Sequence, residues 1–261
     1  MIYLAEGTED TIVINGAENL RFESIELFCG NARGFEINNA DNIVIYDAVL
    51  KAFGEEAIYA QNTTNLLICA SNISDLKRGG INISGGEQLT LTSSGNEIRN
   101  CRVFNYDRVY KTAAAGIALG GVGAAIRNCE IFESPNIGIL FTGNNHIIEN
   151  NKVYDVIKDV WDAGAIYCGR SWLDRGTIIR NNYIYSTTLD YGNIIPGLVY
   201  NSGTDNHAIY IDDLHSGITV TGNIIYNMSR GLLFGGGSDN ICQDSCKCMS
   251  INFVKLAIIL F

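Results

Sequence analysis

The sequence predicts an all-β solenoid, a parallel β-helix with coils of about 22 residues. Three observations indicate this fold. A six-residue unit of alternating apolar residues returns along the chain, its apolar residues are often β-branched, and Gly or Asn follows them. The unit has no helical periodicity. Self-similarity at this period is typical of solenoids, in which no repeat can bury its apolar face alone.

The first strand of each coil lies in the six-residue unit. The clearest copies begin at Ile98, Ile126, Ile148 and Ile179, and weaker copies begin at Val44, Leu67 and Val220. The shortest step between successive starts, from 126 to 148, is 22 residues. We therefore expect a constant coil that carries insertions of variable length.

A second strand recurs once per repeat and is bounded by glycine. Its copies read GINISG (80–85), GIALG (116–120), GILFTG (138–143), GAIYCG (164–169) and GLLFG (231–235). Two or three short strands per coil, broken by Gly and Asn, describe a parallel β-helix.

Stacked coils place equivalent side chains in columns. One column holds asparagine, which tolerates the left-handed backbone of tight turns and whose amides can bond along the axis. A second column is aromatic. The two columns are Asn100, Asn128, Asn150 and Asn181, and Phe104, Phe132, Tyr154, Tyr185 and Tyr226. We interpret both columns as structural.

Composition limits the possible partners. One repeat pattern indicates one elongated domain over residues 1–240, incomplete at both ends, and an aberrant or truncated tail over residues 241–261. The net charge is −10 without a basic run, which argues against nucleic acid and disfavours a strongly anionic polymer. The apolar end of the tail is too short for a bilayer span. We expect a monomer that does not bind membranes.

The chain shows no signal peptide, because Met1 opens directly into a strand-like stretch. Its localisation is therefore open. The 8 Cys form no zinc pattern, and 242–248 reads C-x3-C-x-C without a partner pair. We interpret five others as buried free thiols, namely Cys29, Cys69, Cys101, Cys129 and Cys168. With only 3 His, we expect neither a metal nor an organic cofactor.

Two segments are more specific than the general repeat: DAGAIYCGR at 162–170 and YIDD at 210–213. With GNEIRNC (95–101) and GNNHIIENN (143–151), they make residues 94–240 resemble a family of bacterial right-handed parallel β-helix proteins that includes glycoside hydrolase family 141. The resemblance implies a secreted, longer enzyme that acts on complex plant glycans, such as a fucosidase or xylanase, through paired aspartates. The predicted fold is thus a single-stranded right-handed parallel β-helix.

Asp162 is the first candidate for chemistry. Glycosidases use two carboxyl groups about 5–5.5 Å apart for retention and about 6.5–9.5 Å apart for inversion. Neighbouring coils are about 4.8 Å apart, so stacked carboxylates suit retention. The resemblance favours Asp212 or Asp213 as the partner of Asp162, whereas aligning 165–167 with 208–210 stacks Asp162 over Asp205. All three partners stay open, as does the possibility that these aspartates only end turns and strands.

Five further residues are candidates for substrate binding. Arg170 ends the 162–170 segment and can pair with Asp213 or hold a sugar. His207 follows Asp205 closely and can tune it or bind a sugar. The others are His146, in a Gly-Asn-Asn-His turn, and Tyr167 and Trp172, which can form a sugar-stacking platform.

The insertions predict a groove. They fall at 86–95, 105–114, 155–160 and most heavily at 187–205. Loops on one side of a solenoid commonly build its binding face. We expect 187–205 to wall the site beside Asp162.

Four functions remain possible. The first is a glycoside hydrolase with paired aspartates. The second is a polysaccharide lyase, in which Asp205, Asp212 and Asp213 could hold Ca²⁺, although no Lys lies near them in sequence. The third is a non-catalytic carbohydrate-binding or scaffold solenoid, and the fourth is an inactive fragment.

Overall fold

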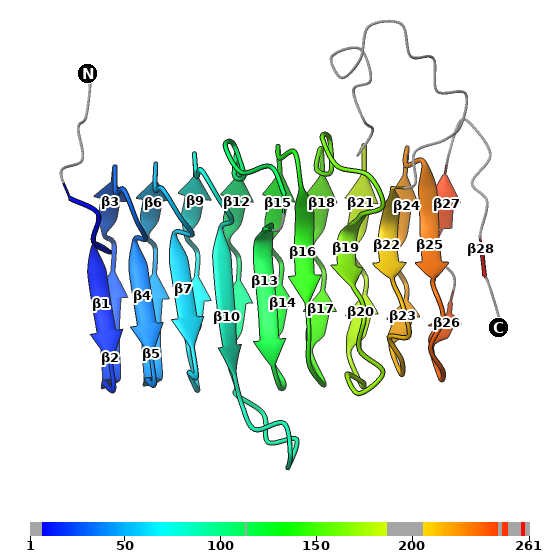
Figure 1. The fold of residues 1–261 in the computed structure, drawn as a ribbon, viewed down its shortest axis with the longest axis horizontal. Coiled ribbons are helices and arrows are strands. Elements are labelled where there is room, and N and C mark those ends of the chain that lie inside the picture. Colours follow the sequence, from blue (N-terminus) through cyan, green and yellow to red (C-terminus); the bar gives the residue numbers. More distant parts are fainter. Residues whose placement is uncertain (1–6, 113, 187–205, 245–246, 250–256, 259–261) are drawn as a thin grey trace, which may run out of the picture.

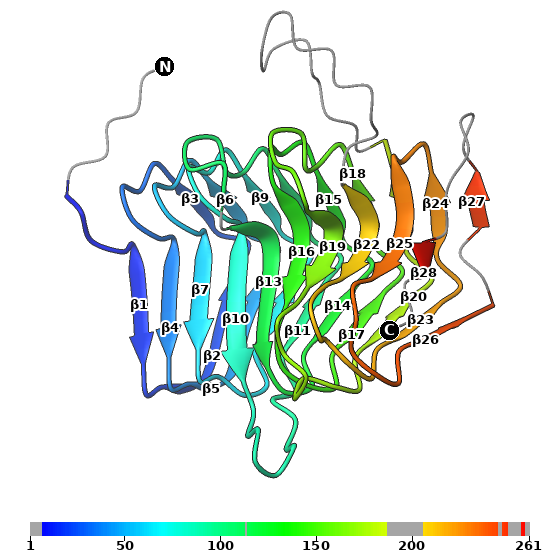
Figure 2. The ribbon, with the colours of Figure 1, turned by 45° about the vertical axis from the view of Figure 1, so that its right-hand side comes forward.

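The computed structural model describes residues 7–112, 114–186, 206–244, 247–249 and 257–258. In this part of the chain three parallel β-sheets wind around one axis, and each coil gives one strand to each sheet (Figure 1). Seen obliquely, the sheets enclose a single core (Figure 2). The predicted right-handed parallel β-helix is confirmed. No helix in the described residues is long and apolar enough to cross a membrane.

We call the three sheets A, B and C, and each takes every third strand of the chain. Sheet A contains β1 (Ile12–Asn15), β4 (Phe35–Asn38), β7 (Ile58–Gln61), β10 (Ile81–Gly85), β13 (Ala115–Gly121), β16 (Ile137–Phe141), β19 (Gly164–Cys168), β22 (His207–Ile211), β25 (Arg230–Phe234) and β28 (Ala257–Ile258). Sheet B contains β2 (Glu18–Glu23), β5 (Asp41–Tyr46), β8 (Leu67–Cys69), β11 (Glu97–Arg99), β14 (Ala125–Arg127), β17 (Ile147–Glu149), β20 (Ile178–Arg180), β23 (Thr219–Thr221) and β26 (Ile241–Gln243). Sheet C contains β3 (Glu26–Phe28), β6 (Val49–Lys51), β9 (Asn72–Ser74), β12 (Arg102–Phe104), β15 (Glu130–Phe132), β18 (Lys152–Tyr154), β21 (Tyr183–Tyr185), β24 (Ile224–Tyr226) and β27 (Lys247–Met249).

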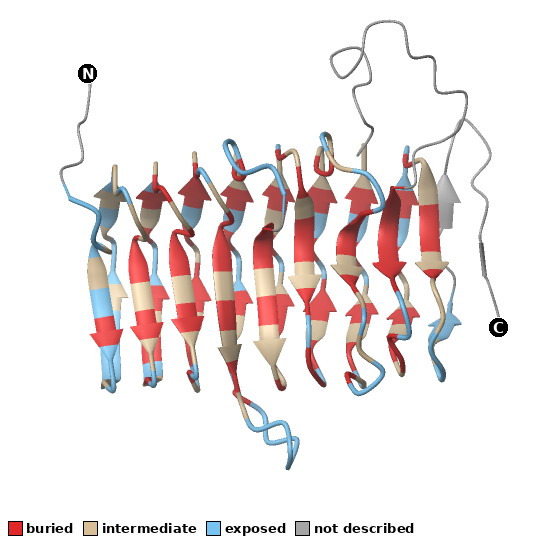
Figure 3. Ribbon diagram, viewed as in Figure 1, coloured by how far each residue is buried: buried red, intermediate tan, exposed pale blue. Residues whose placement is uncertain are grey.

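The core consists of columns of apolar side chains that run along the axis. Ile98, Ile126, Ile148 and Ile179 stack in register across sheet B and are fully buried. Buried positions recur along the strands of all three sheets (Figure 3). Each isoleucine therefore packs between the equivalent residues of the coils on either side.

The register of two of the three weak sequence copies was predicted one residue too early, whereas Val220 aligns with Ile179 as predicted. Ile45 and Ile68, not Val44 and Leu67, align with Ile98. Because side chains in a strand alternate between faces, this shift decides which residue enters the core. Ile45 and Ile68 are fully buried, whereas Val44 and Leu67 are only partly buried.

The aromatic column is confirmed on the outer face of sheet C. Phe104, Phe132, Tyr154 and Tyr185 stack nearly parallel, with ring centroids 4.7–5.0 Å apart. Tyr226 continues the same register. The spacing of the rings matches the spacing of the coils, so the column follows from the fold.

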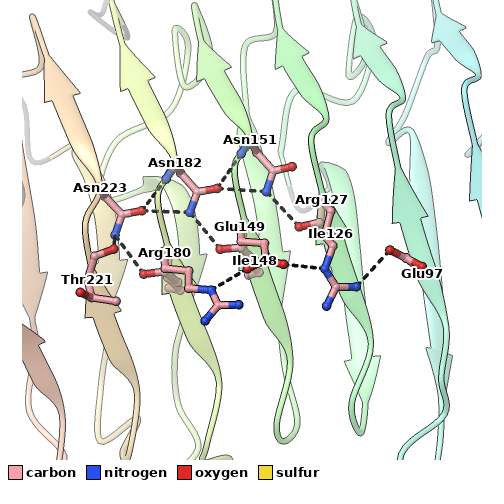
Figure 4. Close-up of polar contacts among 11 residues, drawn as sticks. Glu97, Ile126, Arg127, Ile148, Glu149, Asn151, Arg180, Asn182, Thr221 and Asn223 are labelled. Carbon is pink, nitrogen blue, oxygen red and sulfur yellow. Dashed lines mark hydrogen bonds and ion pairs between the residues drawn. The ribbon is translucent and has the colours of Figure 1, made fainter.

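The asparagine column divides into two neighbouring columns with different roles. Asn100, Asn128, Asn150 and Asn181 have φ between 53° and 58°, which confirms the left-handed turn. The amides that bond along the axis belong to the following residues, namely Asn151, Asn182 and Asn223 (Figure 4). The predicted axial bonding thus lies one residue later than expected.

The Asn182 amide joins its own coil to the coils on either side. Asn182 Nδ2 donates to Ile148 O at 2.9 Å and to Asn223 Oδ1 at 2.9 Å, while Asn182 Oδ1 accepts from Asn151 N and Nδ2, both at 3.0 Å. Asn151, Asn182 and Asn223 are at most 1% exposed. The ladder provides hydrogen-bond partners for main-chain groups at the corner between sheets B and C, which the strands do not pair.

Opposite charges alternate across the outer face of sheet B. Arg127 pairs with Glu97 at 3.0 Å and with Glu149 at 2.6 Å, and Arg180 pairs with Glu149 at 2.5 Å (Figure 4). Hydrogen bonds from Arg127 and Arg180 lower the pKa of Glu149, and burial opposes them only in part. These side chains are partly exposed, so we expect a modest contribution to stability.

The buried thiols are confirmed for four of the five cysteines: Cys69, Cys101, Cys129 and Cys168 are free and buried. Cys29 is free but only partly buried. Strand pairing continues past residue 240 in β26, β27 and β28.

We expect Asn182→Ala to lower the free energy of unfolding by about 2–3 kcal/mol, because it leaves Asn151 N and Ile148 O, two buried main-chain groups of the preceding coil, without this partner. Urea denaturation measures the loss. Asn181→Gly is the matched control, since glycine adopts the positive φ of 55° at residue 181 and should cost only a few tenths of a kcal/mol. Equal losses in the two variants would show that the inner ladder has no special role.

Candidate functional site

Two tyrosines mark the outer face of sheet A where β19 and β22 pair. Tyr167 is in register with Tyr210, and Cys168 with Ile211. Cys168 and Ile211 are fully buried in the core, so the tyrosines point outward, as the sequence alignment of 165–167 with 208–210 predicted. The two rings meet edge to face with centroids 5.4 Å apart.

Each tyrosine donates a hydrogen bond to an aspartate of the neighbouring coil. Tyr167 Oη donates to Asp212 Oδ2 at 2.8 Å, and Tyr210 Oη donates to Asp162 Oδ1 at 3.0 Å. Asp162 precedes β19 by two residues and Asp212 directly follows β22. The carboxylates therefore come from opposite ends of paired strands and reach the same pair of phenols.

Both carboxylates affect the pKa of the Tyr210 phenol. Burial raises the pKa of the Tyr210 phenol, and Asp212 and then Asp162 raise it further. Burial, followed by the hydrogen bond to Asp212, likewise raises the pKa of Tyr167. Both phenols thus stay protonated at physiological pH and act as donors, which suits them to orient carboxylates rather than to accept protons.

The two carboxylates differ in exposure. Asp212 is 7% exposed, and its Oδ1 accepts from Asp213 N at 2.8 Å while its Oδ2 accepts from Tyr167. Asp162 is exposed and has a positive φ of 51°. Asp212 is therefore held in one orientation, whereas Asp162 faces solvent beside it.

Glycines of the 162–170 segment make this close approach possible. A Cβ on Gly164 would lie 2.8 Å from Tyr210 Cβ, and one on Gly169 would lie 2.9 Å from Asp212 Cβ and 3.2 Å from Tyr167 Oη. Real Cβ atoms do not approach so closely. The glycines at both ends of β19 thus leave room for the neighbouring coil's Tyr210 and Asp212.

Arg170 and Asp213 form a pair beside this group, as predicted. Arg170 Nε lies 3.9 Å from Asp213 Oδ2, and Arg170 N donates to Asp213 O at 2.9 Å. The side chains are 80% and 62% exposed, so their attraction is weak and both can reach a ligand.

Of two other predicted residues, His207 packs against a tyrosine of the site, and Trp172 lies on a connection after β19. His207 is 1% exposed, and its ring packs 4.7 Å from that of Tyr210, beneath the site rather than in it. Trp172 is 66% exposed on the connection between β19 and β20. Asp205 and the whole predicted wall, 187–205, lie outside the described residues.

His146 is not brought to the site. Its ring is fully buried, Nδ1 accepts from Ala124 N at 3.1 Å, and Nε2 faces Thr142 O at 2.9 Å. Because a carbonyl only accepts, Nε2 carries the proton and the ring is neutral. Burial lowers the pKa of His146, which fits a histidine that ties a turn together.

The described insertions do not gather on one side. The 86–94 hairpin leaves the lower end of sheet A in Figure 1, whereas 105–114 and 155–163 lie at its upper end. Loops thus extend from both ends of the sheet A strands.

Sequence reasoning missed Tyr210 as a member of the site. Its signal was present, because the alignment of 165–167 with 208–210 pairs it with Tyr167. An outward tyrosine on each of two adjacent coils, next to aspartates, indicates a polar site.

A second polar group on the outer side of sheet A also escaped prediction. Glu56 lies between Arg33 Nε, 3.5 Å away, and Arg78 Nε, 3.4 Å away, and lines a cavity of about 60 Å³ with Arg78 and Asn82. Asp107 is fully buried nearby, and burial raises its pKa to about 6. Within the described residues, no cluster of three or more His, Cys, Asp or Glu could hold a metal ion.

The model of the right-handed β-helix region family matches residues 115–247, just over half of the chain. The chain belongs to this family. A comparison with curated proteins gives no match.

Several solved structures share this fold. A glycoside hydrolase superposes with a TM-score of 0.64 at 16% identity, covering 83% of this chain and 38% of that protein. The A-module of the Azotobacter vinelandii mannuronan C-5 epimerase AlgE4 gives 0.58 at 13% identity, covering 85% and 64%. PfbA, a surface adhesin of Streptococcus pneumoniae, gives 0.55 at 11%, covering 96% and 77%.

At these identities the likeness shows the fold alone. The chain also spans less than two thirds of the length of the hydrolase and of the epimerase module. Any activity must therefore be argued from this chain's own residues.

We expect Asp107→Asn to raise the free energy of unfolding at pH 7.5 by about 2 kcal/mol. The folded-state pKa of about 6 exceeds the ordinary 3.8, so stability is lost as the pH rises through 6 and is regained below 4. Urea unfolding at pH 7.5, 6 and 4 should show the advantage of the variant closing as pH falls. The exposed Asp155→Asn, also at a positive φ, is the control and should change little. An advantage that does not depend on pH would contradict the prediction.

Proposed function

We propose that the protein is a carbohydrate-active enzyme, a glycoside hydrolase that uses Asp162 and Asp212. The observation that carries this proposal is that two neighbouring phenols each bind one of the two carboxylates, Tyr167 that of Asp212 and Tyr210 that of Asp162. Two carboxyl groups on neighbouring coils are what glycoside cleavage requires. The likeness to a solved glycoside hydrolase and to a polysaccharide epimerase module adds support at the level of fold.

The two aspartates take different roles in this mechanism. Asp212 is buried and held by Tyr167 Oη and by Asp213 N, so it serves as the ionised nucleophile or base. Asp162 is exposed and bonded only through Tyr210 Oη, so it serves as the proton donor to the leaving oxygen. An arriving sugar hydroxyl would replace Tyr210 at Asp162 without disturbing Asp212.

Residues around the pair would bind the substrate. Tyr167 and Tyr210 offer apolar ring surface beside the carboxylates, and exposed Arg170 offers guanidinium donors for sugar oxygens. The partner stays an oligo- or polysaccharide, as expected from the lack of a basic surface run.

The test is hydrolysis of xylan and of fucosylated xyloglucan, followed as release of reducing ends. Asp162→Asn and Asp212→Asn should each lower kcat by about 10²-fold or more, because each removes a proton-transfer or nucleophilic group. Asp213→Asn is the matched control one residue away. Its exposed carboxylate pairs only with Arg170, so we expect less than about fivefold change.

Thermal melting of all three variants separates lost chemistry from lost folding. If Asp213→Asn is inactive and Asp212→Asn is not, the pair is wrongly assigned. Mannuronan as a third substrate, with absorbance of unsaturated products as the readout, distinguishes elimination from hydrolysis. Glycan binding without turnover of any substrate would favour the non-catalytic reading.

A further inference from the structure

Two cysteines interrupt the inner ladder at the corner between sheets B and C. On the N-terminal side of Asn151, the column that contains Asn151, Asn182 and Asn223 is occupied by Cys129, Cys101 and Ser71, because the flanking strand residues are paired in register. Cys129 N still donates to Asn151 Oδ1 at 2.8 Å. Cys101, on the preceding coil, is stacked against Cys129. The Cys129 sulfur is a weaker acceptor than an amide oxygen.

Each sulfur lies between a carbonyl of its own coil and one of the preceding coil. Cys129 Sγ is 3.3 Å from Arg127 O and 3.7 Å from Ile98 O, and Cys101 Sγ is 3.3 Å from Arg99 O and 3.6 Å from Ile68 O. Because a thiol has one proton, the shorter contact within the coil competes with the link to the preceding coil. Asn182 makes the equivalent bond to Ile148 O at 2.9 Å. Two consecutive positions of the ladder thus lack a strong side-chain link between their coils.

The two thiols occupy stacked positions on neighbouring coils inside the protein. They are 1% and 2% exposed. The neighbouring Cys129 thiol lowers the pKa of the Cys101 thiol, and Cys101 raises the pKa of the Cys129 thiol. Neighbouring coils are about 4.8 Å apart, which lies within the Cα separation of about 4.4–6.8 Å that a disulfide needs.

We propose that Cys101 and Cys129 form a disulfide that staples two adjacent coils when the protein meets an oxidant of the glutathione-disulfide class. The Cys101 thiolate attacks one sulfur of the oxidant, which releases one thiol and leaves a mixed disulfide. The Cys129 thiol then loses its proton and attacks Cys101 Sγ, which releases the second thiol. Two protein thiols are oxidised to one Sγ–Sγ bond, and one oxidant disulfide is reduced to two thiols.

The disulfide would link two coils at the point where the ladder has thiols instead of amides. It closes a loop that contains all of β12 to β14 and the 105–114 insertion. Because both sulfurs are buried, oxidation proceeds during folding or after local opening of the coils. The staple is independent of the proposed catalysis, since it lies at the corner opposite sheet A.

The experiment is refolding of the full chain from urea with oxidised glutathione, then alkylation, trypsin digestion and mass spectrometry. Trypsin cleaves after Arg99, Arg102 and Arg127, so Cys101 and Cys129 fall on different peptides. We expect one linked species with the mass of the two peptides less two hydrogen atoms. We also expect a melting temperature about 5–10 °C above that of the reduced protein, reversed by dithiothreitol.

Cys69→Ser is the matched control, because Cys69 is also buried and free but stacks on Arg99 instead of a thiol. It should keep the linked peptide and the thermal shift, while Cys101→Ser and Cys129→Ser should lose both. Recovery of both cysteines alkylated, or each carrying glutathione separately, in the refolded wild-type protein would overturn the proposal whether or not the serine variants fold.

Discussion

Stacking of each coil on the next in one register is the constraint on which the rest of the structure depends. Short strands of two to seven residues cannot bury their own apolar faces, so every coil relies on its neighbours for hydrogen bonds and packing. Register therefore decides more than backbone pairing. It sets which isoleucine is buried, which amide joins the ladder, and which aspartate meets which tyrosine.

The same constraint explains why the candidate site lies on sheet A. Sheets B and C have three-residue strands over most of their length, joined by a tight corner that holds the inner ladder. Sheet A has longer strands, and insertions extend from both of its ends. There, two neighbouring coils place outward tyrosines near aspartates from opposite turns. Gly164 and Gly169 are needed because coils this close leave no space for Cβ atoms beside bulky neighbours.

Periodic features could be predicted from the sequence, and features that break the period could not. The middle coils, the aromatic column and the pairing of Tyr167 with Tyr210 all follow from repetition. The first coils were misplaced because Val44 and Ile45, like Leu67 and Ile68, are adjacent apolar residues that fit either face. The ladder was misplaced for a similar reason, since Asn150 and Asn151 look alike until the backbone turns one into the interior. Asp107 was missed because its burial depends on the path of a non-repeating loop.

The alternating charges on sheet B restrict how the number of coils can change. Arg127, Glu149 and Arg180 lie in one register column on consecutive coils, and Glu97 reaches Arg127 from the preceding coil. Removing the coil of Glu149 would set Arg127 beside Arg180, on coils about 4.8 Å apart and without the carboxylate that now pairs with both cations. Removing the coils of Arg127 and Glu149 together would instead bring Glu97 to the coil next to Arg180. In this part of the chain, loss of the Glu149 coil alone is thus less readily tolerated than loss of these two coils together.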